Sequence, residues 1–227
     1  MGQKTPIAVF DLDGTLINGQ SGSLISLYLL SRKVVSVPRA TRLAWWGARY
    51  KLHLPQRQDE PREVIIAALH DRTPEEIRQT MRDFHDEVMV SRYRSEGVRE
   101  VARRKEEGCV TLLASATFRD VAERAAEFLN MDGYVATEME RDASGDYTGN
   151  VEGDVTEGKA KLDAVIKWAS DRFGTDGWYI RYAYGDHGSD VPLLSTARTA
   201  FAVNPSYLMK LAAKRRKWAI LKWGTSA

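Results

Sequence analysis

The chain has 227 residues and a formal net charge of +2, from 33 lysines and arginines and 31 aspartates and glutamates. This balance gives no general attraction to nucleic acid, and no apolar run approaches the roughly 20 residues that span a bilayer. The start of the chain lacks the charged-then-apolar layout of a secretion signal, and its single cysteine, Cys109, cannot form an internal disulfide. We therefore expect a cytoplasmic protein without a nucleic-acid partner, built as one domain or as a core with a small insert.

The first part of the chain is predicted to be one strand followed by helices. The apolar residues 7–10 predict a buried strand that ends at Asp11. Residues 18–92 show helical patterns over 23–32, 39–52, 62–69 and 74–90, with prolines near helix starts and no strand pattern. We interpret residues 18–92 as an all-helical cap inserted into a core made of residues 1–17 and 93–227.

After residue 97 helices and strands alternate. Strands are predicted over 110–114, 134–137, 179–184 and 199–203, helices over 120–129 and 159–173, a short helix at residue 192 and a hairpin around 144–146. This order is typical of an α/β fold, a Rossmann-like parallel sheet with helices on both faces. The basic and aromatic run 210–222 is interpreted as a last helix and strand with a solvated basic face; contact with an anionic membrane surface is the alternative.

Polar side chains follow three of the predicted strands. Asp11 and Asp13 are two residues apart and would crowd on one face of the strand end, unless a cation binds there or one carboxyl holds a proton. Ser115 follows the strand over 110–114, and Asp186 and Asp190 follow the strand over 179–184. Open α/β sheets carry their chemistry at this carboxyl edge. We therefore expect one site here, with the polar groups that a phosphate and a divalent cation need.

A lysine at the start of the helix over 159–173 is expected to offset the negative charge of this site. Lys159 and Lys161 are both candidates, and motif spacing alone does not decide between them. Counted from Lys161, apolar residues at 162, 165 and 168 predict a face that packs on the sheet, with Lys161 on the same side. We favour Lys161 and interpret Lys159 as a solvated residue of the first turn.

Four motifs in this order resemble the haloacid dehalogenase-like phosphohydrolase superfamily, in particular its phosphoserine-phosphatase-like branch with a helical cap after the first strand. They are Asp11-Leu12-Asp13-Gly14-Thr15, Leu112-Leu113-Ala114-Ser115, Lys161, and Gly185-Asp186 with Asp190. The resemblance implies a Mg²⁺-dependent phosphomonoester hydrolase that works through an aspartyl-phosphate. Asp11 would attack phosphorus, and Asp13 would act as general acid and then general base.

The resemblance also implies the remaining site residues. The implied Mg²⁺ ligands are Asp11, the backbone carbonyl of Asp13, and Asp186, with Asp190 positioning them. The implied phosphate-binding residues are Ser115, Lys161 and Gly14. His187, which replaces a residue that is usually small in the family, is assigned no role.

The cap is expected to determine the substrate. In phosphoserine phosphatases a glutamate nine residues after the nucleophile helps to bind the substrate's ammonium group, whereas this chain has Gln20, a neutral amide. We therefore expect a different small phosphorylated metabolite or a phospholipid-derived phosphoester. A phosphoserine phosphatase proper, a phosphotransfer enzyme, and a non-catalytic binding module that keeps the fold are the alternatives, and the sequence does not give the oligomeric state.

Overall fold

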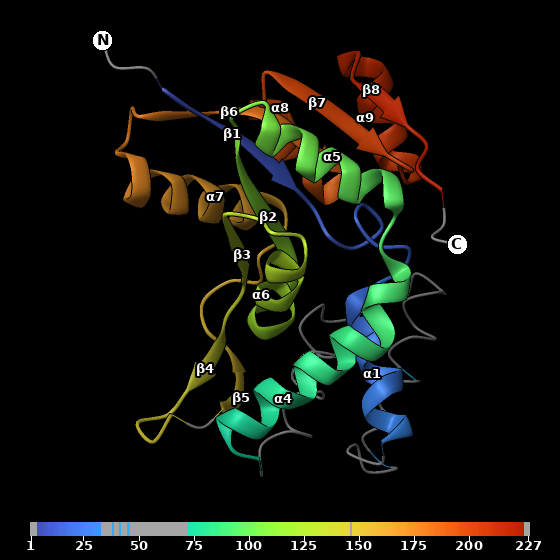
Figure 1. The fold of residues 1–227 in the computed structure, drawn as a ribbon, viewed down its shortest axis with the longest axis vertical. Helices are drawn as coiled ribbons and strands as arrows, with labels where there is room; N and C mark the ends of the chain where they lie inside the picture. Colours follow the sequence, from blue (N-terminus) through green and yellow to red (C-terminus); the bar gives the residue numbers. More distant parts are fainter. Residues whose placement is uncertain are drawn as a thin grey trace.

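The computed structural model describes residues 4–32, 72–145 and 147–224, together with Pro38, Thr41 and Trp45. Six strands form one sheet in the order β3-β2-β1-β6-β7-β8, and every neighbouring pair is parallel. The predicted α/β class is confirmed (Figure 1). The strands are β1 (Thr5–Phe10), β2 (Val110–Phe118), β3 (Gly133–Thr137), β6 (Trp178–Gly185), β7 (Thr199–Val203) and β8 (Ala219–Leu221).

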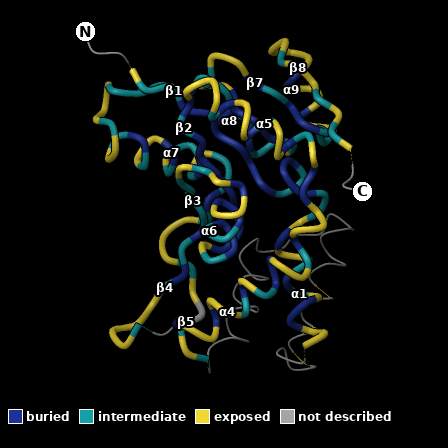
Figure 2. The backbone as a smooth tube through the Cα atoms, in the orientation of Figure 1, coloured by how far each residue is buried: buried dark blue, intermediate teal, exposed yellow. Residues whose placement is uncertain are grey.

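Helices cover both faces of the sheet, because the central strand is apolar on both sides. In β1, Ala8 and Phe10 belong to one buried core, while Ile7 and Val9 belong to the other. The first core includes residues of α5 and α6, and the second includes residues of α7, α8 and α9. Figure 2 shows β1 and β2 buried between these layers. The helices are α5 (Ser95–Glu106), α6 (Arg119–Phe128), α7 (Gly158–Phe173), α8 (Val191–Thr196) and α9 (Tyr207–Arg216).

Two local features of the core bear on the predictions. The predicted hairpin is present as the antiparallel pair β4 (Met139–Arg141) and β5 (Tyr147–Val151). β2 does not end at Ala114 as predicted but continues to Phe118, with a shift in its register against β3 between these residues. The last helix and strand, α9 and β8, close one edge of the sheet, in agreement with the favoured interpretation of the basic carboxyl-terminal run.

The described part of the predicted cap contains α1 (Ser21–Ser31) and α4 (Pro74–Phe84), which lie below the sheet, on the side to which β1 points (Figure 1). The helix predicted over 74–90 is α-helical only to Phe84. A π-helical turn, His85–Met89, and a 3₁₀ turn, Val90–Arg92, follow it. Apart from Thr41 and Trp45, both helical, the helices predicted over 39–52 and 62–69 lie outside the described residues.

The two segments that connect α1 and the 3₁₀ turn to the core run side by side. Asn18 donates its backbone N–H to the carbonyl of Arg92 at 2.8 Å, and Arg94 donates to the carbonyl of Leu16 at 2.9 Å. The pairing holds these two connecting segments together, and α1 begins shortly after the loop that carries Asp13. Among the described helices, none has the length and apolar character required to cross a membrane.

Candidate active site

Asp11 is the first residue after β1 and lies at the carboxyl edge of the sheet, between β2 and β6. Its backbone N–H donates to the carbonyl of Tyr184 at 3.0 Å, which continues the pairing of β1 with β6. Its side chain is 6% exposed, and Oδ2 accepts a hydrogen bond from Thr15 Oγ1 at 3.0 Å. The carboxylate of Asp11 is therefore shielded from water and oriented by the loop that follows it.

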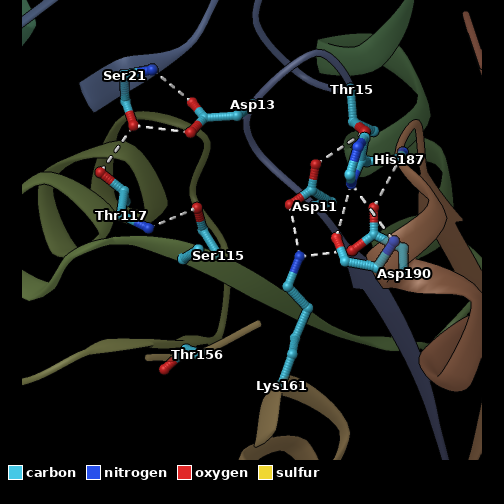
Figure 3. Close-up of polar contacts among 12 residues, drawn as sticks. Asp11, Asp13, Thr15, Ser21, Ser115, Thr117, Thr156, Lys161, His187 and Asp190 are labelled. Carbon is cyan, nitrogen blue, oxygen red and sulfur yellow. Dashed lines mark hydrogen bonds and ion pairs between the residues drawn. The ribbon is translucent and has the colours of Figure 1, made fainter. Parts of the chain in front are cut away.

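Lys161 extends from the first turn of α7 to this carboxylate (Figure 3). Its Nζ lies 2.8 Å from Asp11 Oδ1 and 2.6 Å from Asp190 Oδ1, and its side chain is 4% exposed. Attraction between opposite charges is much stronger in such a buried pair than at the surface. The fold thus brings together groups that are 150 positions apart in the sequence.

A buried threonine fixes the start of α7 against the sheet. Thr137, the last residue of β3, donates its hydroxyl to the carbonyl of Ala116 at 2.9 Å. The same oxygen accepts from the backbone N–H of Thr156, two residues before α7, at 3.1 Å. These bonds tie the ends of β2 and β3 to the helix that carries Lys161.

The structure separates the two candidate lysines. Lys159 has an 81% exposed side chain and forms an ion pair with Asp163 one turn further along α7. The apolar face counted from Lys161 packs on the sheet, since Val165 is buried in the core on that side and Leu162 packs against it. Lys161, and not Lys159, lies at the strand ends.

Asp186 and Asp190, from the loop after β6, complete an acidic cluster with Asp11. One carboxylate oxygen from each of the three lies within 4.8 Å of the others. Two glycines permit this approach. At Gly14, where φ is +75°, a Cβ would lie 2.2 Å from Asp186 Oδ2, and at Gly185 a Cβ would lie 2.7 Å from Asp190 Oδ2.

Burial of this cluster changes the pKa values of its members. Burial raises the pKa of Asp186 to about 7, and the charge of Asp190 adds to the shift. Burial also raises the pKa of Asp11 well above its usual range, although the Lys161 ammonium opposes the rise. For Lys161, burial alone would lower the pKa, but the charges of Asp11 and Asp190 outweigh it and raise the pKa. One ammonium does not balance these carboxyl groups, so a further cation would favour their ionised forms.

The Asp13 carboxylate points toward the start of α1 (Figure 3). Its Oδ1 accepts from the backbone N–H of Ser21 at 2.7 Å, and its Oδ2 lies 2.9 Å from Ser21 Oγ. Ser21 Oγ also lies 2.8 Å from Thr117 Oγ1, and the backbone N–H of Thr117 donates to Ser115 Oγ at 3.2 Å. Hydrogen bonds therefore link Ser115, within β2, to Asp13.

Gln20 and His187 lie at the ends of helical segments. Gln20 is the exposed N-cap residue of α1, and its side chain makes no capping hydrogen bond. His187 is exposed and precedes the 3₁₀ turn Gly188–Asp190, where its backbone N–H donates to Asp190 Oδ2 at 3.3 Å. His187 therefore contacts Asp190 of the cluster through its backbone N–H.

Comparison with known proteins assigns the family. A model of the haloacid dehalogenase-like hydrolase family matches residues 8–195, which include all the site residues described above. This chain belongs to the haloacid dehalogenase-like hydrolase family. The resemblance expected from the motifs is confirmed, as is the expectation that the protein is an enzyme of this class.

The relatives of this haloacid dehalogenase-like hydrolase include curated phosphatases. Histidinol-phosphatase of Neisseria meningitidis is 25% identical over 223 residues, which cover 96% of this chain and 98% of that protein. Phosphoserine phosphatase SerB1 of Mycobacterium tuberculosis is 27% identical over 222 residues, which cover 95% of this chain and 70% of that protein.

Solved structures share the fold. A protein from Bordetella pertussis superposes with a TM-score of 0.82 at 24% identity, covering 96% of this chain and 99% of the other. A phosphoserine phosphatase, in the form of a phospho-aspartyl intermediate analogue, superposes with a TM-score of 0.64 at 18% identity. That match covers 99% of this chain and 96% of the other. The phosphoserine-phosphatase-like fold predicted for the chain is confirmed.

The acidic cluster of this hydrolase fits a divalent cation. Asp11, Asp186 and Asp190 offer carboxylate oxygens, the donors that Mg²⁺ prefers. When ionised, these three carboxylates and the Lys161 ammonium leave two negative charges, which one divalent cation would balance. Asp190 already accepts hydrogen bonds on both oxygens, from Lys161 and from the backbone of His187. Asp11 does the same, from Lys161 and Thr15, so these hydrogen bonds do not rank the carboxylates as ligands.

Sequence reasoning missed three residues of this hydrolase's site: Thr15, Ser21 and Thr117. Thr15 stands inside the first motif and Thr117 directly follows Ser115-Ala116, but neither position predicts a partner. Ser21 stands in the run Gln20-Ser21-Gly22-Ser23, which is typical of a helix start. That signal predicts the helix and not the carboxylate that its first residue binds.

Proposed function

We propose that this enzyme is a Mg²⁺-dependent phosphomonoester hydrolase that forms an aspartyl-phosphate on Asp11. The observation that carries the proposal is the buried ammonium of Lys161, held 2.8 Å from Asp11 and 2.6 Å from Asp190 beside the Asp186 carboxylate. Phosphoryl transfer depends mainly on positioning and on neutralising the charge of the phosphoryl group. A buried carboxylate, a paired cation and a cluster suited to Mg²⁺ supply those requirements.

In the first step a carboxylate oxygen of Asp11 forms a bond to phosphorus while the bond from phosphorus to the leaving oxygen breaks. The Asp11 oxygens already accept from Thr15 and Lys161, and an ionised carboxylate has further lone pairs for the attack. Asp13 gives its proton to the leaving oxygen, which departs as an alcohol. Lys161 and the Ser115 hydroxyl stabilise the negative charge on the phosphoryl oxygens.

In the second step Asp13, now a carboxylate, takes a proton from a water molecule as that water attacks phosphorus. The bond between phosphorus and Asp11 breaks, inorganic phosphate leaves, and both aspartates return to their starting states. The backbone of Gly14 is assigned to the phosphate-binding loop. Its N–H donates to the carbonyl of Gly19 at 3.0 Å, so this bond would have to open before the N–H could bind phosphate.

Asp11, Asp186 and the backbone carbonyl of Asp13 would hold Mg²⁺, and Asp190 would orient Lys161 and the loop after β6. When bound, the cation would polarise a phosphoryl oxygen and neutralise charge. The structure supports this assignment through the mutual approach of the Asp11 and Asp186 oxygens and through the raised pKa of Asp186. Burial is the main cause of the raised pKa and the charge of Asp190 adds to it, so a bound cation would favour the ionised form of Asp186.

We assign the substrate class as a small phosphorylated metabolite or a phospholipid-derived phosphoester. The two curated relatives above are named for histidinol phosphate and phosphoserine, so these compounds are the first to test. The exposed amide of Gln20 cannot form an ionic contact with a substrate ammonium group, which disfavours phosphoserine.

The test is a phosphate-release screen with the full chain in Mg²⁺ and in EDTA. The panel holds L-histidinol phosphate, L-phosphoserine, phosphorylated headgroups, lysophosphatidic acid, sugar phosphates and nucleotides, each with an Asp11→Asn control. We expect Mg²⁺-dependent release from at least one compound and none with the variant. Absence of release from every compound would favour a non-catalytic binding module, and migration of the phosphoryl group within a substrate would indicate phosphotransfer.

A further inference from the structure

Ser21 holds both oxygens of the Asp13 carboxyl group. It is the first residue of α1, and its backbone N–H donates to Oδ1 at 2.7 Å while its hydroxyl lies 2.9 Å from Oδ2. Two contacts on one carboxyl group fix both its position and the orientation of its plane. Ser21 is only 1% exposed, so water does not compete for these bonds.

Thr117 fixes Ser21 in turn. Its Oγ1 lies 2.8 Å from Ser21 Oγ, and its backbone N–H donates to Ser115 Oγ at 3.2 Å. Both Ser21 and Thr117 are buried, and they come from α1 and from the end of β2. Their contact joins the first helix of the predicted cap to the strand that carries the phosphate-site serine (Figure 3).

The two hydroxyl groups can satisfy Asp13 with or without a proton. When Asp13 is a carboxylate, Ser21 donates its hydroxyl proton to Oδ2 and Thr117 donates to Ser21 Oγ. When Oδ2 carries a proton, Asp13 donates to Ser21 Oγ and Ser21 donates to Thr117 Oγ1. Each hydroxyl is one donor and two acceptors, so in both arrangements one proton lies between Asp13 Oδ2 and Ser21 Oγ and another between Ser21 Oγ and Thr117 Oγ1. The backbone N–H of Ser21 donates to Oδ1 at 2.7 Å, and we take Oδ2, which faces the two hydroxyl groups, as the oxygen that exchanges the proton.

We propose that Ser21 and Thr117 are positioning residues that orient Asp13 for proton transfer to and from the leaving oxygen. This inference rests on the proposed function. As the phosphoryl group transfers to Asp11, the leaving oxygen keeps the electron pair of the broken phosphorus–oxygen bond. The bond between Asp13 Oδ2 and its proton then breaks, and the leaving oxygen takes that proton. The Ser21 and Thr117 hydroxyl groups then turn to donate toward the new carboxylate, without losing protons themselves.

The test compares substrates whose leaving groups differ in their need for a proton. Phenyl phosphate requires protonation of the leaving oxygen, whereas the nitrophenolate of 4-nitrophenyl phosphate departs without it. Positioned general acids contribute about 10²–10⁴-fold. Since Ser21→Ala keeps the backbone donor, we expect kcat/KM to fall about 10- to 100-fold with phenyl phosphate and less than about 3-fold with 4-nitrophenyl phosphate.

Three further variants make the test specific. Ser21→Thr keeps the hydroxyl and should restore the ratio between the two substrates, while Thr117→Val removes the second hydroxyl and should change the ratio in the same direction as Ser21→Ala. Ser23→Ala lies two residues along α1 on an exposed position and should change neither rate. If Ser21→Ala does not fold, Thr117→Val carries the test.

Two results would overturn the inference: equal losses on both substrates, or no loss with Ser21→Ala and Thr117→Val. Asp13→Asn separates a failure of this inference from a failure of the proposed function. If Asp13→Asn discriminates between the substrates and the Ser21 and Thr117 variants do not, only the positioning role is wrong. If the unchanged enzyme hydrolyses neither these two compounds nor any compound of the phosphate-release screen, or if Asp11→Asn keeps its activity, the proposed function fails.

Discussion

Replacement of Lys161 by methionine tests how much its buried ammonium group contributes to the stability and the activity of the protein. The variant removes an ammonium group that lies 2.8 Å and 2.6 Å from two carboxylates, and the side chains of Asp11 and Asp190 are only 6% and 2% exposed. Removing one partner from a buried ion pair costs about 3–5 kcal/mol, because the remaining charge is left unpaired. A domain with a total stability of about 5–15 kcal/mol would in most cases remain folded after this loss. Loss of a preorganised donor at developing negative charge lowers kcat by about 10²–10³-fold.

The loss of stability in Lys161→Met should depend on pH. Without the ammonium, the pKa of Asp11 rises further, because burial now acts without the opposing charge. The folded variant then binds more protons than the unfolded chain, so its free energy of unfolding increases as the pH falls. We expect the deficit relative to the unchanged protein to be full at pH 8 and smaller at pH 5.5.

Urea denaturation at the two pH values measures this deficit, and phosphate release measures the activity. Lys159→Met is the matched control, since Lys159 stands two residues away on the same helix with an 81% exposed side chain. It should change neither quantity. If Lys161→Met matched this control in stability at pH 8, or kept kcat within about 3-fold, the assigned role of the buried ammonium would be wrong.

Three further outcomes are expected. Asp11→Asn is nearly isosteric and should keep its fold by circular dichroism while losing all turnover; residual Mg²⁺-dependent turnover would contradict the assigned nucleophile. Gly14→Ala places a Cβ 2.2 Å from Asp186 Oδ2 at a φ of +75°. This variant should lose about 1–2 kcal/mol of its free energy of unfolding and need a higher Mg²⁺ concentration for half-maximal activity. Gly22→Ala, with no atom within 4 Å of its Cβ, should change neither quantity. Because burial raises the pKa of Asp186 to about 7, the metal-free protein should lose stability as the pH rises from about 4 to 7. Mg²⁺ should therefore raise Tm more at pH 8 than at pH 5.5. Equal shifts in Tm at the two pH values would argue against Asp186 as a ligand.

The sequence was sufficient to predict the sheet and the groups at its carboxyl edge. Asp11, Ser115 and Asp186 each follow or end an apolar run, and parallel strands bring such positions to one edge whatever the details of packing. Lys161 could be favoured over Lys159 because the apolar spacing of α7 shows which side of the helix faces the sheet. The placement of these groups follows from local periodicity and a general rule of topology, whereas their roles come from the resemblance to the family, whose usual lysine spacing also favours Lys161.

The remaining features depend on tertiary contacts that no local pattern reveals. Ser21 and Thr117 are 96 positions apart, and a serine at a helix start is equally compatible with a solvated cap. The π-helical turn at His85–Met89 interrupts a helix that periodicity predicts to be continuous, and the buried His85 ring lies between Asp86 and Tyr93. The rings of Tyr93 and Phe128, which contact the His85 ring, come later in the chain, so periodicity within the helix does not predict these contacts.

The covalent intermediate is the most direct test of the proposed chemistry. Enzyme mixed with a ³²P-labelled substrate and quenched in acid within one turnover should carry label on the peptide that contains Asp11. Hydroxylamine should release that label, as it does from an acyl phosphate, and Asp11→Asn should carry none. Label on a different residue, or rapid hydrolysis without any labelled protein, would contradict the account.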